Sequence, residues 1–290
     1  MRNTITTMKP FWMEKTKDSS TVIQDLISSL NNKREVTLAL RTGLIDARAD
    51  FSFLRVRGLR NILKFLRSIA DSDSAICVFW STQSAPQLQV VPVLFRYSLN
   101  RSVTENLVPN LDHVFSVKPM KITSPSTDTE VALALRVLEG CCLLHRDSAG
   151  FAHRHNATKV LMDILSSGGV LVRGPCLDAL VAIMLDSSSN QKDFEACHGI
   201  EKITELIKDN QVEENIRLRC GEFLLILIGH LNGKEKTPMA KIHEDIRLLL
   251  GERSASLIWA ASQFGSTLDP EQRQMALQIQ ARRVLESLEL

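Results

Sequence analysis

The sequence predicts an all-α protein, an armadillo-like right-handed helical solenoid with flanking N- and C-terminal helices. Three observations support this fold class: a stretch that nearly repeats itself every 42 to 44 residues, apolar residues at helical spacing, and few aromatic residues. Aromatic residues make up 5% of the 290 residues, so leucine, isoleucine, valine, alanine and methionine must build the core. Such a core suits helices packed on helices better than sheets.

The near-repeat lies between Glu130 and Leu231. Its matching pairs are Leu135-x-Val137-Leu138 with Leu177-x-Ala179-Leu180 at 42 residues, Phe151 with Phe194 at 43, and Arg173-x-x-Cys176 with Arg217-x-x-Cys220 at 44. A period in the forties is typical of stacked helical repeats. Stacked repeats form extended binding surfaces and rarely form active sites. The repeat therefore predicts a protein that binds other proteins.

The N-terminal part of the chain divides into two pieces. Residues 1–18 lack periodicity, and we expect a flexible N-terminus there. Residues 19–81 form a predicted N-terminal helical segment. Its first helix starts after Ser19-Ser20-Thr21 and closes at Asn31-Asn32, a second covers about 33–49, and an amphipathic third runs from Phe53 to Ala70.

Residues 82–128 form a proline-containing irregular connection in this prediction. Five of the nine prolines lie here, at Pro86, Pro92, Pro109, Pro119 and Pro125. Each proline removes a backbone donor and restricts the preceding residue, so a long helix cannot run through the segment. The apolar stretch from Leu88 to Leu99 fits either an extended strand or a short helix.

Residues 129–232 form the predicted armadillo-like repeat core, and residues 233–290 the C-terminal capping helices. The core helices are expected at Glu130–His145, Lys159–Leu165, Pro175–Leu185, a short helix from Phe194, Glu201–Lys208 and Ile216–Leu231. Several are apolar nearly all round, as expected of buried helices. Asp269-Pro270-Glu271 is a favourable start for the last helix, because it combines a carboxylate cap with proline in the first turn.

Charge and apolar patterning indicate a soluble protein of the cytoplasm or nucleus. Residues 1–70 carry 13 Lys or Arg against 6 Asp or Glu, a balance of +7, and residues 126–290 carry 18 against 23, a balance of −5. Neither balance is strong enough to indicate nucleic-acid binding. Apolar runs such as Phe223–Ile228 are far shorter than the ~20 residues of a membrane span. The six cysteines show no disulfide-framework spacing.

A thiol and imidazole group is the main chemical alternative. Its members are Cys141, Cys142, His145, His153, His155, Cys197 and His198. Zinc needs four such ligands at tetrahedral geometry, but no Cys-x2-Cys pair anchors the set, and two adjacent cysteines of a helix cannot face one point. We therefore expect core packing for the cysteines, helix-capping or surface positions for the histidines, and no metal or other cofactor. A metal-binding or enzymatic protein stays as the competing hypothesis.

The central block carries a more specific pattern. Its elements are Glu139-Gly140-Cys141-Cys142-Leu143-Leu144-His145, Leu177-Asp178-Ala179-Leu180-Val181, Leu185-Asp186-Ser187, Asn190, Phe194-Glu195, Gly199-Ile200 and Arg217-x-Arg219-Cys220-x-Glu222-Phe223-Leu224. In this order and spacing, the block resembles the cell division control protein fourteen family, the septation-initiation-network component.

The resemblance implies a non-catalytic armadillo-like scaffold or kinase-binding subunit in cell division and cytokinesis. It also implies a partner of the Ste20-like, germinal-centre type of protein kinase, and a place in the cytoplasm, the nucleus, or at the spindle pole or division site. A generic armadillo adaptor without a cell-division role is the alternative.

An unrelated phosphatase shares the family name, and the sequence excludes that enzyme class. Its chemistry requires a cysteine thiolate followed by an arginine in a Cys-x5-Arg loop that holds the phosphate. The residues six positions after the cysteines are Gln83, Asp147, Ser148, Ala182, Ile203 and Ile226. Since none is arginine, we expect no catalytic residues of this kind.

Two sets of surface residues are candidate binding residues. Arg60, Lys64 and Arg67 lie on one face of a predicted helix, after Arg55 and Arg57, and would suit an acidic partner or a membrane surface. The alternative is a solvated helix face. On the central helices, Arg136, Glu139, Asp178 and Glu222 are expected at exposed positions of the concave surface, where solenoids usually bind partners.

Arg173 and Arg217 each precede a cysteine by three residues at the start of a central helix. We favour a structural role, in which they tie adjacent turns through Asp178 or Glu222. The alternative is a ladder of exposed arginines that binds an acidic peptide.

Overall fold

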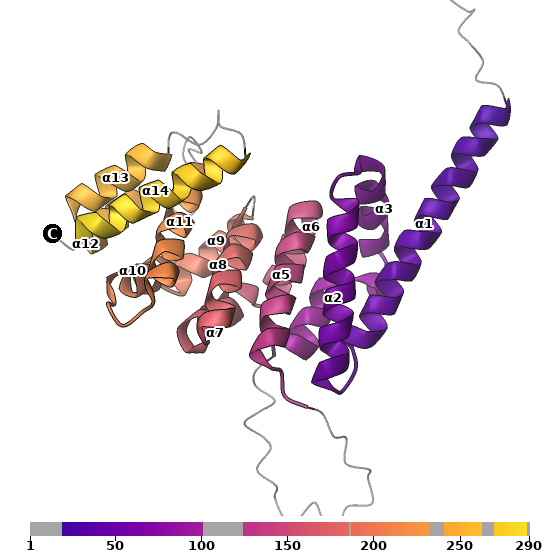
Figure 1. Ribbon diagram of the computed structural model, residues 1–290, viewed down its shortest axis with the longest axis horizontal. Coiled ribbons are helices and arrows are strands. Elements are labelled where there is room, and N and C mark those ends of the chain that lie inside the picture. Colours follow the sequence, from indigo (N-terminus) through magenta and orange to yellow (C-terminus); the bar gives the residue numbers. More distant parts are fainter. Residues whose placement is uncertain (1–18, 101–123, 186, 232–240, 263–269, 289–290) are drawn as a thin grey trace, which may run out of the picture.

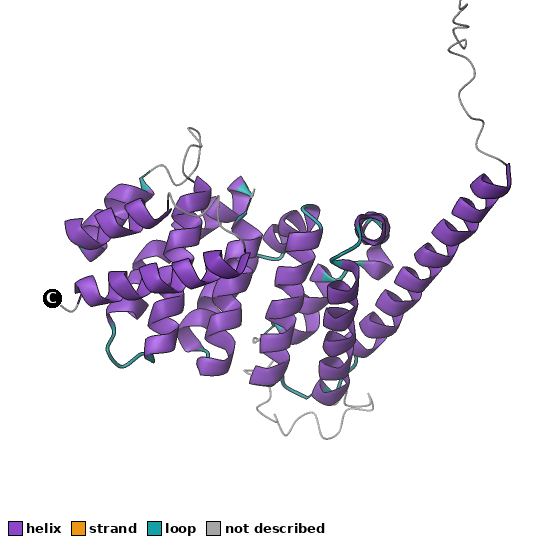
Figure 2. Ribbon diagram, turned by 45° about the horizontal axis from the view of Figure 1, so that its top comes forward, coloured by secondary structure: helices purple, strands orange, loops and turns teal. Residues whose placement is uncertain are grey.

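The computed structural model describes residues 19–100, 124–185, 187–231, 241–262 and 270–288. In these ranges the chain forms helices and connecting loops, with no strand (Figure 2). The prediction of an all-α protein is therefore confirmed. The predicted flexible N-terminus, residues 1–18, lies outside the described residues.

The helices differ strongly in length. The longer ones are α1 (Ser19–Ala47), α2 (Ser52–Ile69), α5 (Asp128–Leu144), α8 (Val170–Met184), α11 (Glu214–Leu231) and α14 (Pro270–Leu288). The shorter ones are α3 (Asp73–Gln83), α4 (Val91–Val93), α6 (Asp147–Arg154), α7 (Ala157–Ser167), α9 (Ser188–Ala196), α10 (Gly199–Lys208), α12 (Ile242–Leu250) and α13 (Glu252–Ser262). A 3₁₀ turn, η1 (Pro86–Leu88), and a π-helical turn, η2 (Leu94–Ser98), complete the described elements.

The longer helices form one row. Helix α1 packs on α2, α2 on α5, α5 on α8, α8 on α11, and α11 on α14. Figure 1 shows this order from α1 at one end to α12, α13 and α14 at the other, with the shorter helices lying against the row. The core is continuous along the row, because buried apolar side chains from all of these helices belong to one contact cluster.

A three-helix unit occurs twice along the row. Helices α5, α6 and α7 form one copy, and α8, α9 and α10 form the next. In each copy the residue before the third helix has left-handed backbone, with φ of 53° at both Asn156 and His198, 42 residues apart. Leu135 and Leu177, which the sequence repeat pairs, are both buried. The sequence period of 42 residues therefore corresponds to a repeating local structure.

Helices α1 and α2 approach each other at two glycines. A Cβ atom added to Gly58 would lie 2.6 Å from the carbonyl oxygen of Gly43 and 2.5 Å from the backbone nitrogen of Ala47. No side chain fits at such distances, so glycine at position 58 permits backbone-to-backbone contact. Leu40 and Leu44 of α1, in the same part of the helix, are fully buried.

Two predicted helix boundaries are wrong. Asn31-Asn32 does not end a helix, and α1 continues from Ser19 to Ala47. Asparagine costs well under 1 kcal/mol in a helix interior, which packing against α2 can overcome. Helix α8 begins at Val170, not at Pro175. The proline leaves only the carbonyl of Leu171 without its usual donor, and Leu171 is 56% exposed, so water can replace that bond.

The apolar stretch from Leu88 to Leu99 forms short helical turns, which decides between the two alternatives. The side chain of Gln83 organises it: Nε2 donates to the carbonyl oxygen of Leu88 at 3.1 Å, and Oε1 accepts from the backbone N–H of Val90 at 3.1 Å. Gln83 is 1% exposed, and these bonds satisfy its amide inside the core. The turns then place Val90, Val91 and Leu94 among buried side chains.

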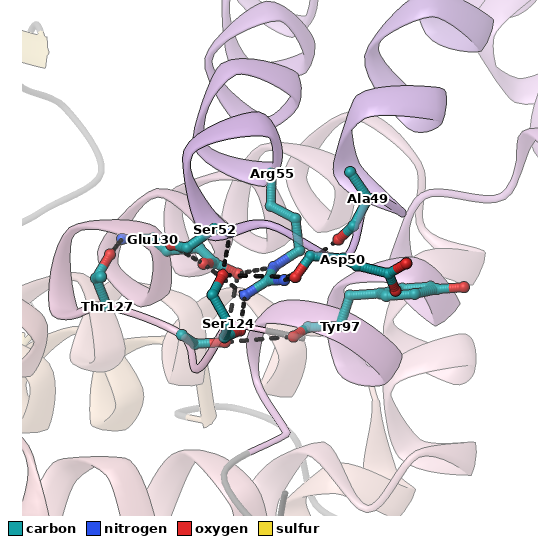
Figure 3. Close-up of polar contacts among 9 residues, drawn as sticks. Ala49, Asp50, Ser52, Arg55, Tyr97, Ser124, Thr127 and Glu130 are labelled. Carbon is teal, nitrogen blue, oxygen red and sulfur yellow. Dashed lines mark hydrogen bonds and ion pairs between the residues drawn. The ribbon is translucent and has the colours of Figure 1, made fainter. Parts of the chain in front are cut away.

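A buried ion pair joins the N-terminal ends of α2 and α5 (Figure 3). Arg55 Nε donates to Glu130 Oε1 at 2.7 Å and Nη2 to Oε2 at 3.1 Å. The remaining Arg55 donors reach the carbonyl oxygens of Asp50 and Ser124, both at 2.8 Å. Ser52 Oγ donates to Glu130 Oε2 at 2.6 Å. The charges are thus paired and hydrogen-bonded, as burial requires.

Candidate protein-binding groove

One groove crosses four neighbouring helices of the row. It has a volume of about 410 Å³ and is formed by α2, α5, α8 and α11. We call it the charged groove, and its lining residues are Leu63, Leu66, Arg67, Ala70, Arg136, Glu139, Gly140, Leu143, Leu144, Asp178 and Arg219. Leucine side chains come from α2 and α5, and charged groups of both signs lie beside them.

An ion pair between α8 and α11 forms the far side of the charged groove. Arg219 Nη1 donates to Asp178 Oδ1 at 2.7 Å and lies 3.0 Å from Oδ2. Both side chains are 38% exposed, so solvent screens the pair and it contributes about 0–1 kcal/mol to stability. The aliphatic part of Arg219 passes Gly174 of α8, where an added Cβ would lie 3.7 Å from Arg219 Cδ. The pair fixes the position of two charges at the groove.

Three carboxyl groups gather around Arg219. Burial raises the pKa of Glu139, and the charge of Asp178 raises it further, against Arg136 and Arg219, which lower it. Burial also raises the pKa of Asp178, while Arg219 opposes this. The pKa of Glu222 is raised by burial as well, lowered by Arg219 and raised by Asp178. Since Arg219 acts on all three carboxyl groups, it is the electrostatic centre of the groove.

The structure brings three of the four predicted central-helix residues together. Arg136, Glu139 and Asp178 all line the charged groove, and Arg136 is exposed. Glu222 is 8% exposed and is not a lining residue, so the exposed position expected for it is wrong. It lies on α11 three residues after Arg219, whose positive charge lowers the pKa of Glu222.

The apolar part of the groove has an open edge. Leu143 of α5 is 61% exposed, although it lies in a helix that is otherwise largely buried. Gly140, one turn earlier, lets α5 approach α2, because an added Cβ would lie 3.2 Å from Leu66 Cδ1. Leu143 therefore leaves apolar surface open at the edge of the groove.

The predicted basic face is partly present. Arg60, Lys64 and Arg67 are exposed on α2, and Arg67 lines the charged groove. The two arginines before them have other roles, since Arg55 is buried against Glu130 and Arg57 pairs with Asp46 at 2.7 Å. The basic face is therefore shorter than the sequence indicates, and it adjoins the groove at Arg67.

The sequence predicted a contact of Asp178 with Arg173 or Arg217, but a different arginine pairs with Asp178 in the structure. Arg217 is 9% exposed, and its Nε donates to the carbonyl oxygen of Ile207 at 2.8 Å, so it is no part of an exposed ladder. Arg173 is half-buried, with its Nε enclosed. The arginine that reaches Asp178 is Arg219.

The thiol and imidazole group is dispersed in the structure. His145 contacts Ser148 Oγ at 2.9 Å, His153 contacts Asp193 Oδ2 at 2.7 Å, His198 contacts Glu201 Oε1 at 3.3 Å, and His155 stacks on Phe95. In the part of the chain that the structure describes, no three His, Cys, Asp or Glu side chains are placed to hold a metal ion.

The cysteines of the central helices are poor nucleophiles. Burial raises the pKa of Cys142 to about 12 and that of Cys220 to about 12, and it raises the pKa of Cys141 well above its usual value. The thiolate, which is the reactive form, is therefore disfavoured at neutral pH. Cys176 is also buried, and its Sγ contacts the carbonyl oxygen of Leu161 at 3.1 Å.

Comparison with known proteins gives one family. The model described as cell division control protein 14, SIN component, matches residues 93–278. No curated protein sequence matches the chain. The crystal structure of an engineered protein is similar at 12% identity and a TM-score of 0.40, over 86% of this chain and 96% of that chain. None of the described helices is both long and apolar enough to cross a membrane.

Proposed function

Because the chain belongs to the cell division control protein 14 family, the SIN component, we propose that it is a non-catalytic armadillo-like scaffold or kinase-binding subunit in cell division signalling. The family match is the observation that carries this proposal. It extends from the end of α4 into α14 and so includes both copies of the three-helix unit and three of the four helices of the charged groove. A cell-division role is therefore favoured over that of a generic adaptor.

The armadillo-like part of the proposal is supported by local structure. Two consecutive three-helix units of similar helix lengths have left-handed residues at Asn156 and His198, in matching positions. The central helices α5, α8 and α11 pack in sequence order, so each unit buries its apolar face against its neighbours. Repeats that cannot bury their apolar faces alone are the basis of solenoid architecture.

The charged groove is the proposed partner surface. Its leucines, with the exposed Leu143 at the edge, offer contact area to an apolar side chain. Arg67, Arg136 and the Asp178–Arg219 pair provide charges of both signs beside it. This combination suits an amphipathic helix of a partner protein, whose apolar face fills the groove and whose charges fix the orientation. In line with the family resemblance, the proposed partner is a Ste20-like protein kinase.

A pull-down from dividing cells tests the proposal. The tagged full chain is compared with a Leu143→Asp variant, which places a charge at the apolar edge of the groove. The matched control is Leu248→Asp on α12, because Leu248 is 76% exposed and α12 does not line the groove. We expect mass spectrometry to identify a Ste20-like kinase with the native chain and the Leu248 variant, and to lose it with the Leu143 variant.

Two other results would change the proposal in different ways. A kinase recovered equally by all three chains would remove the groove as the binding surface but keep the kinase partner. No kinase with any chain, although all three are folded by circular dichroism, would contradict the kinase-binding role. Localisation to the division site, also proposed from the family, is checked by imaging the tagged chain through mitosis.

A further inference from the structure

A second pocket lies on different elements from the charged groove. It has a volume of about 640 Å³ and is formed by the end of α1, η1, α4, η2 and the residue that follows α6. Three of its lining residues are basic: Arg48, Arg96 and His155. None of the described lining residues is acidic. We call it the basic pocket.

The two arginines are available to a ligand. Arg48 Nη2 donates to the carbonyl oxygen of Gln87 at 2.8 Å, which holds the guanidinium at the pocket wall and leaves further N–H groups. Arg96 is exposed at the end of η2. Among the residues that the structure describes, no carboxylate forms an ion pair with Arg48 or Arg96. In contrast, Arg55, Arg57 and Arg219 are all neutralised by carboxylates.

The third basic residue is held by stacking. The ring of His155 lies parallel to that of Phe95, with centroids 5.7 Å apart and an interplanar angle of 5°. Burial lowers the pKa of His155, and the positive charges of Arg154 and Arg96 lower it further. Arg154 itself lies over the ring of Phe151. An adjoining pocket shares Phe95 and His155 with the basic pocket as a common wall. The acidic residue that lines this adjoining pocket is Asp163.

We propose that the basic pocket binds a phosphorylated serine or threonine side chain of a partner protein. A phosphate monoester carries about −1.5 to −2 charges at neutral pH, so it can balance two arginines, whereas a carboxylate leaves one uncompensated. Guanidinium groups match phosphate oxygens with paired hydrogen bonds. The exposed amide of Gln87 beside the arginines can bond to the partner's backbone, which favours a peptide over a free anion.

Binding of the phosphate should also favour the protonated form of His155, the third basic residue of the pocket. A dianion near His155 raises the pKa of that imidazole, opposing the effect of Arg96 and Arg154. The protonated ring then adds a charged donor to the phosphate. The proposal does not depend on the charged groove, since the two pockets share no lining residue.

Peptide binding by the purified full chain tests the proposal. The probes are degenerate peptide pools with a central phosphoserine, serine or glutamate. We expect the phosphoserine pool to bind and the other two to bind at least about tenfold more weakly, because serine brings no charge to the two arginines and glutamate brings only one. The double variant Arg48→Gln, Arg96→Gln should lose that preference. The matched control is Arg60→Gln, Lys64→Gln, which removes the same charge from the exposed face of α2 and should keep it.

A spectroscopic readout separates the site from general charge effects. The His155 pKa, measured by NMR with the histidine signals assigned by a His155→Gln variant, should rise when the phosphoserine pool is added. It should also rise in Arg96→Gln without ligand, since that substitution removes one of the charges that lower it.

Three results with the peptide pools would overturn the proposal. These are equal binding of the phosphoserine and serine pools, binding that survives the double variant, and a His155 pKa that does not change when the phosphoserine pool is added. Preferential binding to phosphatidylcholine vesicles containing phosphoinositide, with no response to peptide, would overturn it in favour of a membrane headgroup.

Discussion

Arg55 Nε and Glu130 Oε1 lie 2.7 Å apart inside the protein, with 4% and 0% of their side chains exposed. The two residues are 75 positions apart in the sequence and belong to neighbouring helices of the row, α2 and α5. Glu130 is in the first turn of α5, whose N-cap Thr127 accepts the backbone N–H of Glu130 at 3.3 Å. The carboxylate thus lies at the favourable end of its helix and reaches across to the other. This pair couples the N-terminal helices to the repeating units.

Removal of one partner of this pair should be strongly destabilising. Glu130→Ala leaves the guanidinium of Arg55 buried without its counter-charge, and we expect a loss of about 3–5 kcal/mol in the free energy of unfolding. Urea unfolding followed by circular dichroism measures it. Arg57→Ala is the matched control, because Arg57 pairs with Asp46 but is 61% exposed. Its cost should be much smaller, because solvent screens this exposed pair, and equal costs for the two variants would contradict the buried clamp.

Glu139 makes stability depend on pH. Because burial raises its pKa in the folded state, the unfolded chain ionises first as pH rises from about 4.5, and the native state loses stability up to the folded pKa. Glu139→Gln removes this loss, so the variant should melt at a higher temperature than the native chain at pH 7. The difference should disappear below pH 4.5. Glu205→Gln, at an exposed position of α10, is the control, and a pH-independent difference would contradict the prediction.

Phe194 and Gly199 depend on each other. Phe194 is fully buried, and a Cβ on Gly199 would lie 2.3 Å from its ring. We expect Phe194→Ala to cost about 3–5 kcal/mol and Gly199→Ala about 1–3 kcal/mol, through overpacking. Gly150→Ala on α6 is the control, since no atom lies within 4 Å of the added Cβ. Differential scanning calorimetry should show a lower melting temperature for the first two variants and no decrease for the control.

The cysteines should differ widely in reactivity. Cys77 is exposed and Cys197 half-buried, whereas the other four are buried, and burial raises the pKa of Cys142 and Cys220 to about 12. We expect a thiol reagent such as 5,5′-dithiobis(2-nitrobenzoate) to modify Cys77 first in the native protein. A Cys77→Ser variant should lose that fast phase, and full modification should require denaturant. Fast reaction of Cys142 in the native protein would show that α5 is more accessible than the structure indicates.

Local pattern predicted the helices of the repeat core well. The expected helix Glu130–His145 corresponds to α5, Ile216–Leu231 to α11, and the start at Asp269-Pro270-Glu271 to α14. These features depend on apolar spacing and on caps within a few residues. The boundary at Asn32 failed because tertiary packing outweighs a small local penalty. The boundary at Pro175 failed because water can replace the hydrogen bond that the proline removes at exposed Leu171.

Long-range pairs could not be predicted in the same way. The sequence placed Arg55 before a predicted basic helix face, and nothing near it indicated that Glu130 would neutralise it, because a residue's partner depends on how helices stack. For the charged groove, Arg136, Glu139 and Asp178 were found from their helix positions. Arg219 was missed, because which of two nearby arginines reaches Asp178 depends on the rotation of α11 about its axis. The basic pocket was not found, since its three cations come from separate elements.

The described ranges that end at Asn100 and begin again at Ser124 are tied to one cluster of contacts. Ser126 Oγ lies 3.3 Å from the carbonyl oxygen of Tyr97, and the backbone N–H of Ser124 donates to Asp50 at 2.9 Å. Noncovalent contacts, and not only the peptide bonds that join the two ranges, therefore hold α2 against α5. A protein cut by a protease between Asn100 and Ser124 would therefore remain one particle, made of two fragments that stay bound to each other.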